Sequence, residues 1–355
     1  WSSDVCSSDL GISIMEKPVL KALAGKSKKS PVWMMRQAGR HLPEYRELRK
    51  EYSFLQLLQA PKAAAEASLQ PLRRYDLDAV IVFSDILVPL QALGMDLDFR
   101  PGPYIANPLR NLAEFRALPP ADFQTAAGSL MEALQILRRE LTDTPKTLLG
   151  FAGAPYTLAT YAIEGKSSKH FEFVKGWLYQ DPSGFREILD KLADLTIEYL
   201  LLQVEAGAEA VQLFDTWAGE LSLETYRESI LPSTAKIFEA LKKKEIPTLL
   251  YANGASHLIE AQIESGADAI SVDWRRDISF YLDKIPTTIG IQGNLDPSLL
   301  FAAPEKIIQE TTKILQATKG RGNHILNLGH GLHPTTPIEG VQAFVDTAKN
   351  FEPAN

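Results

Sequence analysis

The segments EAGAEAVQLFD (residues 205–215) and ESGADAISVD (residues 264–273) repeat one plan. Each reads as a helix end, a glycine suited to the residue after a helix, a two-residue link and a strand that ends in aspartate. The segment LDAVIVFSD (residues 77–85) follows the strand half of this plan. Repeated βα units favour a closed (β/α)8 barrel, although an open doubly wound sheet of similar units would show the same repetition.

Short runs rich in apolar and β-branched residues alternate with longer amphipathic stretches along the rest of the chain. Several runs lack polar alternation, as expected of strands buried on both faces of a parallel sheet. Their number predicts an α/β fold, a single-domain (β/α)8 TIM-type barrel with its active-site cleft at the C-terminal ends of the strands. The eight predicted strands are residues 32–35, 79–84, 147–152, 210–214, 248–252, 269–272, 288–292 and 324–328.

The stretches between these runs include two clear helix candidates. Residues 61–75 begin with proline, which suits the first turn of a helix, and residues 187–203 carry apolar side chains at helical spacing. The proline-containing stretch 101–125 reads as a long loop with a short helix. No segment is rich enough in glycine, serine or charge to indicate a linker to a second domain.

The composition describes a soluble globular chain: 45% of the residues are hydrophobic, 23% are charged and the net charge is −7. An acidic protein is not expected to coat nucleic acid, so an anionic ligand would have to meet a local basic cluster. The longest uncharged stretch found, residues 147–163, is interrupted by Gly150, Gly153 and Pro155. We therefore expect no membrane span.

The opening WSSDVCSSDL (residues 1–10) is unlike the rest of the chain and resembles a translated sequencing adapter. We interpret residues 1–10 as a non-native segment, Met15 as the true start, and residues 15–352 as the barrel domain. Cys6 is the one cysteine of the chain, which excludes a disulfide framework and, beyond residue 10, thiolate metal sites and thiol nucleophiles. We expect no metal site, and the cytoplasm as the compartment.

Because the active site of such a barrel lies at the carboxyl ends of its strands, the residues that follow each predicted strand are the candidates. The segment 31–50 has a local charge of +3, and Arg36 and Arg40 directly follow its strand. A guanidinium binds carboxylate or phosphate in a fork and stays charged in any environment, so these two arginines predict an anion receptor. Arg46 and Lys50 read instead as a solvated helix face.

Asp85 follows an apolar strand, where an unpaired carboxylate is costly. Backbone N–H groups could satisfy it, or it could face the barrel mouth and await donors from a ligand; we favour the second. Asp215 and Asp273 have similar contexts, but either could simply cap the next helix. His330 is flanked by glycines that allow a ligand to approach the backbone closely. Together these residues suit a polycarboxylate substrate without naming a reaction.

Two longer segments point to a known family. PVWMMRQAGR (residues 31–40) and GFAGAPYTLATYAIEG (residues 150–165) resemble the two signature segments of the uroporphyrinogen decarboxylase family. Shorter segments resemble it in matching order: FSDIL (83–87), FDTWAG (214–219), QGNLDP (292–297) and NLGHG (327–331). The resemblance covers residues 15–350, and it implies a single-domain barrel, a homodimer with facing clefts, and no metal or organic cofactor.

The resemblance also implies an activity. Members of the family decarboxylate the four acetate side chains of uroporphyrinogen III to methyl groups, which gives coproporphyrinogen III in porphyrin and haem biosynthesis. Matched positions make Arg36, Arg40 and Arg49 ligands of substrate carboxylates and make Asp85 the acceptor of the pyrrole N–H groups. Tyr161, Thr216 and His330 match residues around the reacting acetate. The remaining substrate contacts expected from the matched segments are Gln37, Ala38, Gly39 and Phe214.

The chemistry fits these residues, because a pyrrole-acetate loses CO2 once the ring carbon is protonated and the ring becomes an electron sink. Asp85 would stabilise the cation. We assign catalytic roles to Asp85, Arg36, Tyr161 and His330. An always-charged guanidinium is a poor acid, so the proton donor stays open between Tyr161, His330 and a relayed water.

Two other functions compete with this one. Methyltransferases of the same superfamily bind zinc through histidine and cysteine, and no cysteine follows Cys6 in this chain. A catalytically silent tetrapyrrole-binding protein would keep the cleft without the reaction. Every matched position is filled, but only turnover distinguishes this alternative from the enzyme.

Overall fold

A computed structural model describes residues 16–100 and 102–352. The expected adapter-derived segment, residues 1–10, and the expected start at Met15 lie outside the described residues. Seven parallel strands form one sheet in the order β1-β4-β5-β6-β7-β8-β9. They are β1 (Ala79–Ile81), β4 (Thr147–Gly153), β5 (Ala210–Phe214), β6 (Thr248–Tyr251), β7 (Ala269–Ser271), β8 (Gly290–Gln292) and β9 (His324–Ile325).

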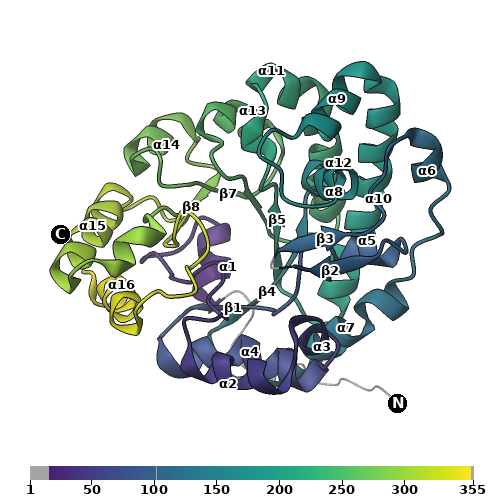
Figure 1. The fold of residues 1–355 in the computed structure, drawn as a ribbon. Helices are drawn as coiled ribbons and strands as arrows, with labels where there is room; N and C mark the ends of the chain where they lie inside the picture. The colour runs from purple at the N-terminus through teal and green to yellow at the C-terminus, as the bar shows by residue number, and fades with distance from the viewer. Residues whose placement is uncertain (1–15, 101, 353–355) are drawn as a thin grey trace, which may run out of the picture.

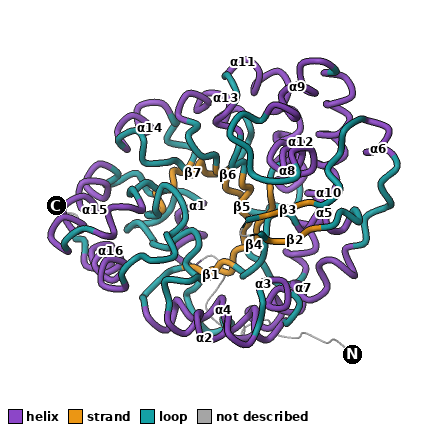
Figure 2. The backbone as a smooth tube through the Cα atoms, viewed as in Figure 1, coloured by secondary structure: helices purple, strands orange, loops and turns teal. Residues whose placement is uncertain are grey.

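Helices surround this curled sheet, and Figures 1 and 2 show the strands inside and the helices outside. The longer helices are α2 (Pro43–Glu51), α4 (Pro61–Arg74), α7 (Phe123–Glu140), α8 (Pro155–Glu164), α9 (Glu172–Gln180), α10 (Pro182–Glu205), α12 (Leu231–Lys242), α15 (Pro304–Ala317) and α16 (Ile338–Asn350). The shorter ones are α1 (Pro18–Leu23), α3 (Phe54–Leu58), α5 (Val88–Ala92), α6 (Leu112–Arg116), α11 (Leu223–Thr225), α13 (Ile259–Glu264) and α14 (Ile278–Lys284). None in the described part is long and apolar enough to cross a bilayer.

The ring closes through a single residue where the sequence predicts a whole strand. Val32 pairs in parallel with Leu326, and its carbonyl accepts the N–H of Asp78 at 2.8 Å on the other side. The prediction of a strand over residues 32–35 is wrong beyond this bridge, because the chain turns at 35–36 and the N–H of Gln37 returns to the carbonyl of Met34. The other seven predicted strands are confirmed in position, and β1, β8 and β9 are shorter than expected.

The helix predictions for 61–75 and 187–203 are confirmed as α4 and α10. Pro61 begins α4, and the side chain of Asp181 caps α10 by accepting the N–H of Gly184 at 2.9 Å. The predicted loop 101–125 is only partly confirmed. Its start belongs to an antiparallel ribbon of β2 (Leu97–Phe99) and β3 (Pro103–Ile105), and α6 is the short helix that follows.

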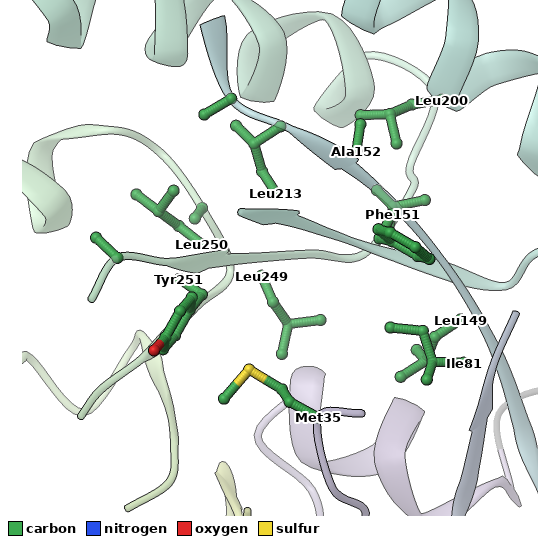
Figure 3. Close-up of a cluster of buried hydrophobic side chains, with 14 of the residues drawn as sticks. Met35, Ile81, Leu149, Phe151, Ala152, Leu200, Leu213, Leu249, Leu250 and Tyr251 are labelled. Atoms are coloured by element: carbon green, nitrogen blue, oxygen red, sulfur yellow. The ribbon is translucent and has the colours of Figure 1, made fainter. Parts of the chain in front are cut away.

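The barrel interior is filled by side chains from several strands. Met35 reaches from the first loop toward Leu249 and Tyr251 of β6, as Figure 3 shows. Beside this apolar cluster, the indole N–H of Trp33 donates to the side-chain oxygen of Gln292 at 2.8 Å, and the amide of Gln292 donates to Gln212 at 2.8 Å. Buried polar groups are costly unless paired, so this chain of hydrogen bonds ties the first segment to β8 and β5.

Candidate active site

The first loop is held in place by a buried glutamine. Gln37 is fully buried, and its side-chain amide donates to the carbonyl of Ala79 in β1 at 2.9 Å. Its side-chain oxygen accepts the N–H of Met34 at 3.1 Å. Both ends of the amide are occupied by backbone, so Gln37 fixes the turn rather than presenting a free polar group to a ligand.

The exposed side chain of Arg36 leaves this turn next to the last loop of the barrel. Arg36 has φ 60°, a left-handed conformation that residues other than glycine seldom adopt. Its Cγ and Cδ lie against Gly331 so closely that a Cβ at position 331 would overlap them. Gly331 therefore permits the contact between the first and last loops. Ala38 and Gly39 are partly exposed and lead to the exposed Arg40.

The other basic residues of this segment are anchored along the loop and α2. Nη1 of Arg46 donates to the carbonyl of Arg40 at 2.8 Å, so Arg46 supports the loop rather than lying free on a helix face. Nε of Arg49 donates to the carbonyl of Tyr52 at 3.2 Å, and its guanidinium lies 5.7 Å from the ring centre of Phe54. Arg49 is thus a partly buried cation with a defined position.

Asp85 follows β1 and is partly exposed. One carboxylate oxygen accepts the N–H of Leu87 at 2.8 Å. Burial raises the pKa of Asp85 from 3.8 to about 6, while the Leu87 N–H and the charge of Arg36 act in the opposite direction. One backbone donor therefore satisfies the carboxylate in part, and the residue stays partly exposed.

Tyr161 lies on α8, almost fully buried, with its ring centre 6.0 Å from that of Trp217. Burial raises its pKa, Trp217 opposes that rise, and the nearby charges of Asp85 and Arg36 act in opposite directions. The phenol is consequently protonated at neutral pH. Because the charges of Asp85 and Arg36 both affect the pKa of Tyr161, the three side chains lie in the same region.

His330 lies beside the rings of Tyr251 and Trp274, and this group of rings is called the aromatic wall below. Its ring centre lies 5.9 Å from that of Tyr251 and 6.5 Å from that of Trp274, in both cases stacked. Burial lowers the pKa of His330 to about 4, and the positive charges of Arg36 and Arg275 lower it further. The imidazole is therefore neutral at pH 7.

The end of β5 supplies Phe214 and Thr216, which are both partly exposed. Phe214 extends the aromatic wall, with its ring centre 5.6 Å from that of Phe151. Between them, Asp215 is fully buried; one oxygen accepts the hydroxyl of Thr157 at 2.9 Å, and the other has no partner within the described residues. Burial raises the pKa of Asp215 to about 7.

Asp273 does not cap the next helix, α14, whose first turn is capped by Asp277; it ties the neighbouring loops together instead. Its buried carboxylate accepts the N–H of Gly254 at 2.8 Å and the hydroxyl of Tyr281 at 3.2 Å, and it pairs with the guanidinium of Arg275. These partners come from three loops or helices, so Asp273 joins neighbouring parts of the barrel rim. Both of its oxygens have protein partners.

The structure thus brings three candidate side chains within electrostatic reach of a fourth, Arg36. Arg36 acts on Asp85, Tyr161 and His330 alike. Arg40 and Arg49 lie farther along the first loop and α2. Among residues 16–100 and 102–352, no three His, Cys, Asp or Glu side chains are grouped as metal ligands would be.

Sequence reasoning missed several residues of this region: Trp217, Tyr251, Trp274 and Arg275. Each follows or ends a predicted strand, which was the rule applied to the charged candidates. The three aromatic residues carry no charge, and an aromatic ring near a strand end belongs more often to the core than to a site. Arg275 lies outside the basic segment 31–50, so no local charge excess drew attention to it.

Comparison with known proteins identifies the chain. The family model described as uroporphyrinogen decarboxylase (URO-D) matches residues 15–351. This chain belongs to the uroporphyrinogen decarboxylase family. It is similar to proteins named uroporphyrinogen decarboxylase from Streptomyces avermitilis, with 43% identity and 89% of each chain covered, and from Streptomyces coelicolor, with 44% identity and the same coverage. The protein of that name from Trichlorobacter lovleyi is 40% identical over 94% of this chain and 98% of its own.

Among solved structures, a methyltransferase from Methanosarcina mazei matches with a TM-score of 0.79, covering 94% of this chain and 98% of its own. Its sequence is only 20% identical, so the likeness concerns the fold. The two longer segments of the sequence analysis, residues 31–40 and 150–165, form the turn around Gln37 and the end of β4 with α8, which position Arg36 and Tyr161.

Proposed function

We infer that this chain decarboxylates the acetate side chains of uroporphyrinogen to methyl groups, a step of porphyrin biosynthesis. The observation that carries this inference is the family match over residues 15–351, supported by curated relatives of that name at 40–44% identity. The chemistry of the cleft agrees, because it combines arginines for carboxylates with an apolar aromatic wall for a macrocycle.

Asp85 is proposed to hold the pyrrole N–H groups and to stabilise the ring cation that forms on protonation. Its backbone donor Leu87 occupies one oxygen, and the carboxylate keeps acceptor capacity for the substrate. A negative charge already in position when positive charge develops on the ring lowers the barrier without reorganisation. The electrons of the breaking C–C bond then flow into the cationic ring as CO2 leaves, which gives a neutral ring with an exocyclic methylene. A proton is added to the methylene carbon, and the proton first placed on the ring carbon is lost, which restores the pyrrole with its new methyl group.

Arg36, Arg40 and Arg49 are proposed to bind substrate carboxylates. Arg36 is exposed, close to Asp85, and held by its unusual backbone conformation and by the contact with Gly331. It can therefore orient the acetate that reacts, whereas Arg40 and Arg49 can hold others. Gln37, Ala38 and Gly39 are proposed to shape the loop between the arginines, with Gln37 acting through the backbone.

Tyr161, Phe214, Thr216 and His330 are proposed to surround the reacting acetate. Tyr161 and His330 are both uncharged at neutral pH, so they can donate hydrogen bonds without adding charge beside the ring cation. The proton donor is proposed to be Tyr161, His330 or a relayed water, because burial keeps both side chains uncharged at pH 7 without singling out one acid.

The chain is also proposed to form a homodimer with facing clefts, to work in the cytoplasm and to need no cofactor. The family resemblance supports all three proposals, and the single cysteine of the chain supports a reducing compartment. Light scattering on the purified chain tests the dimer: the expected mass is twice 39.3 kDa, and a monomer across the working concentration range would contradict it.

The decisive experiment is an anaerobic assay with uroporphyrinogen III and a chelator, without added metal. After oxidation, chromatography counts the carboxyl groups of the products. Successive loss of carboxyl groups down to the four-carboxyl product is expected. Binding of the substrate without any loss of carboxyl groups would instead indicate a silent tetrapyrrole-binding protein.

A further inference from the structure

Arg275 is an exposed guanidinium at the rim of the barrel, in the loop after β7. Its Nη1 is held by the carboxylate of Asp273, as noted above, and it donates to the side-chain oxygen of Asn253 at 3.0 Å. The guanidinium carbon lies 4.5 Å from the ring centre of Trp274. Two anchors and a stacking surface fix the direction of this side chain, although 48% of it is exposed.

The surface that carries Arg275 is continuous with the proposed site. Trp274 is sandwiched, because Arg275 stacks on it and the ring of His330 lies nearly parallel to it, at 14° and 6.5 Å. Arg36 approaches His330 from the first loop, through its contact with Gly331. Arg275 and Arg36 also both act electrostatically on Tyr251 and on His330. Two guanidinium groups therefore lie near the same aromatic rings.

The hydrogen-bonding capacity of Arg275 is only partly used. In the part of the chain that the structure describes, its protein acceptors are bonded to Nη1, which leaves Nε and Nη2 as a pair of parallel donors. That pair matches the two oxygens of a carboxylate. Asp273 can balance the charge of the guanidinium, but it contacts Nη1 and does not block the edge formed by Nε and Nη2.

We propose that Arg275 is a specificity-determining residue that binds a second carboxylate of the substrate, across the aromatic wall from Arg36. This rests on the proposed function, since it needs a polycarboxylate in the cleft. The ligand is a carboxylate side chain of the macrocycle, either one that is lost in the reaction or one that remains in the product. Asp273 and Trp274 are positioning residues for Arg275.

The test compares Arg275→Gln and Arg275→Lys with the matched control Arg276→Ala. Arg276 is the next residue, is also exposed, and stacks on Phe280 instead of Trp274. A charge-assisted hydrogen bond lost from a binding site weakens binding about tenfold or more. We therefore expect KM for uroporphyrinogen to rise about tenfold in Arg275→Gln, with kcat within about threefold, and no change in Arg276→Ala.

Arg275→Lys keeps the folded chain testable if the neutral variant fails to fold. A lysine can still neutralise Asp273, but it cannot also present two parallel donors, so KM should rise at least about threefold. KM equal to that of the unmodified chain in a folded Arg275→Lys or Arg275→Gln variant would overturn the proposal, as would an equal rise in Arg276→Ala.

KM measured with uroporphyrinogen and with its partly decarboxylated intermediates separates the two sources of the carboxylate. If Arg275 binds a carboxylate that remains, KM rises equally for uroporphyrinogen and for the partly decarboxylated intermediates; if it binds one that is lost, KM rises for the substrates that still carry it. Failure of this inference is distinguishable from failure of the proposed function. In the first case the unmodified chain still decarboxylates uroporphyrinogen, and in the second it does not.

Discussion

The two ends of the barrel use acidic residues in opposite ways. At the N-terminal end, Asp78, Glu209 and Asp268 each precede a strand and accept the N–H at the start of the neighbouring strand, respectively from Val32, Leu148 and Thr248. Glu209 also pairs with Lys17 at 2.8 Å and with Arg138 at 2.6 Å. Asp78 and Glu209 have partners on both carboxylate oxygens, Asp268 has partners on one, and all three join adjacent segments of the barrel.

At the C-terminal end, the aspartates that close the same repeats differ from one another. Asp273 is saturated by partners, Asp215 has one unpartnered oxygen, and Asp85 has one backbone donor and some exposure. The same βα repeat thus places carboxylates that join neighbouring strands before the strands, and carboxylates that differ in their number of hydrogen-bond partners after them. The difference teaches that residue type at a strand end locates the rim of the barrel, whereas the protein partners decide which carboxylates keep capacity to accept further hydrogen bonds.

The largest effect is expected at the N-terminal end of the barrel, from Glu209→Gln. This change leaves Lys17, 1% exposed, without its counter-charge, and an unpaired buried charge costs about 3 to 5 kcal/mol of folding free energy. Denaturant unfolding should show this loss, while kcat per folded molecule stays unchanged. A large fall in kcat at unchanged stability would contradict the division between the two ends.

The reverse is expected for Asp85→Asn at the cleft end. Removing one preorganised charge should lower turnover by at least about 100-fold. The unfolding midpoint should hardly move, because the amide oxygen can still accept the N–H of Leu87. Near-normal turnover in this variant would exclude the role proposed for Asp85.

A smaller effect is expected from the arginines of the first loop. Arg36→Ala and Arg40→Ala should each raise KM about tenfold, at least as much as they lower kcat, because each loses a charged hydrogen bond to the substrate. Lys50→Ala is the matched control, since Lys50 pairs with Glu47 on the exposed face of α2. An unchanged KM in both arginine variants would count against a carboxylate clamp.

The pH dependence should be the smallest and most specific effect. The raised pKa of Asp85 means that the carboxylate takes up a proton as the pH falls through about 6, so turnover should decline below that value, about tenfold per pH unit. Because the folded chain binds this proton more tightly than the unfolded chain, the stability that the proton contributes is fully present below pH 3.8 and is lost as the pH rises through about 6. Asp85→Asn should lack the acidic decline in its residual turnover, measured as a kcat profile.

The failure at the first strand shows where periodicity stops being informative. Residues 32–35 are apolar and buried, as a strand would be, yet only Val32 pairs. The turn after Trp33 depends on the side-chain amide of Gln37 bonding to Met34 and to β1, which is a contact across 42 residues of chain. Apolar pattern reports burial, and burial alone does not distinguish a strand from a packed turn.

The candidate residues show the same limit. Arg36, Asp85 and His330 could be named from their places after predicted strands, because parallel strands bring their carboxyl ends to one face. Three other features depend on partners elsewhere in the chain. Gln37 bonds to backbone, both oxygens of Asp273 are occupied, and Arg275 stacks on Trp274 beside His330.

Local residue patterns were sufficient for the barrel class, the family, and the strand ends that carry the chemistry, because these follow from periodicity and from motifs within short segments. Tertiary contacts alone decided the charge state of His330, the raised pKa of Asp85 and the division of the acids into strand-joining and site residues. The physical reason is desolvation: the charge state of a group depends on how much water and how many partners the folded chain leaves around it, and no local pattern contains that information.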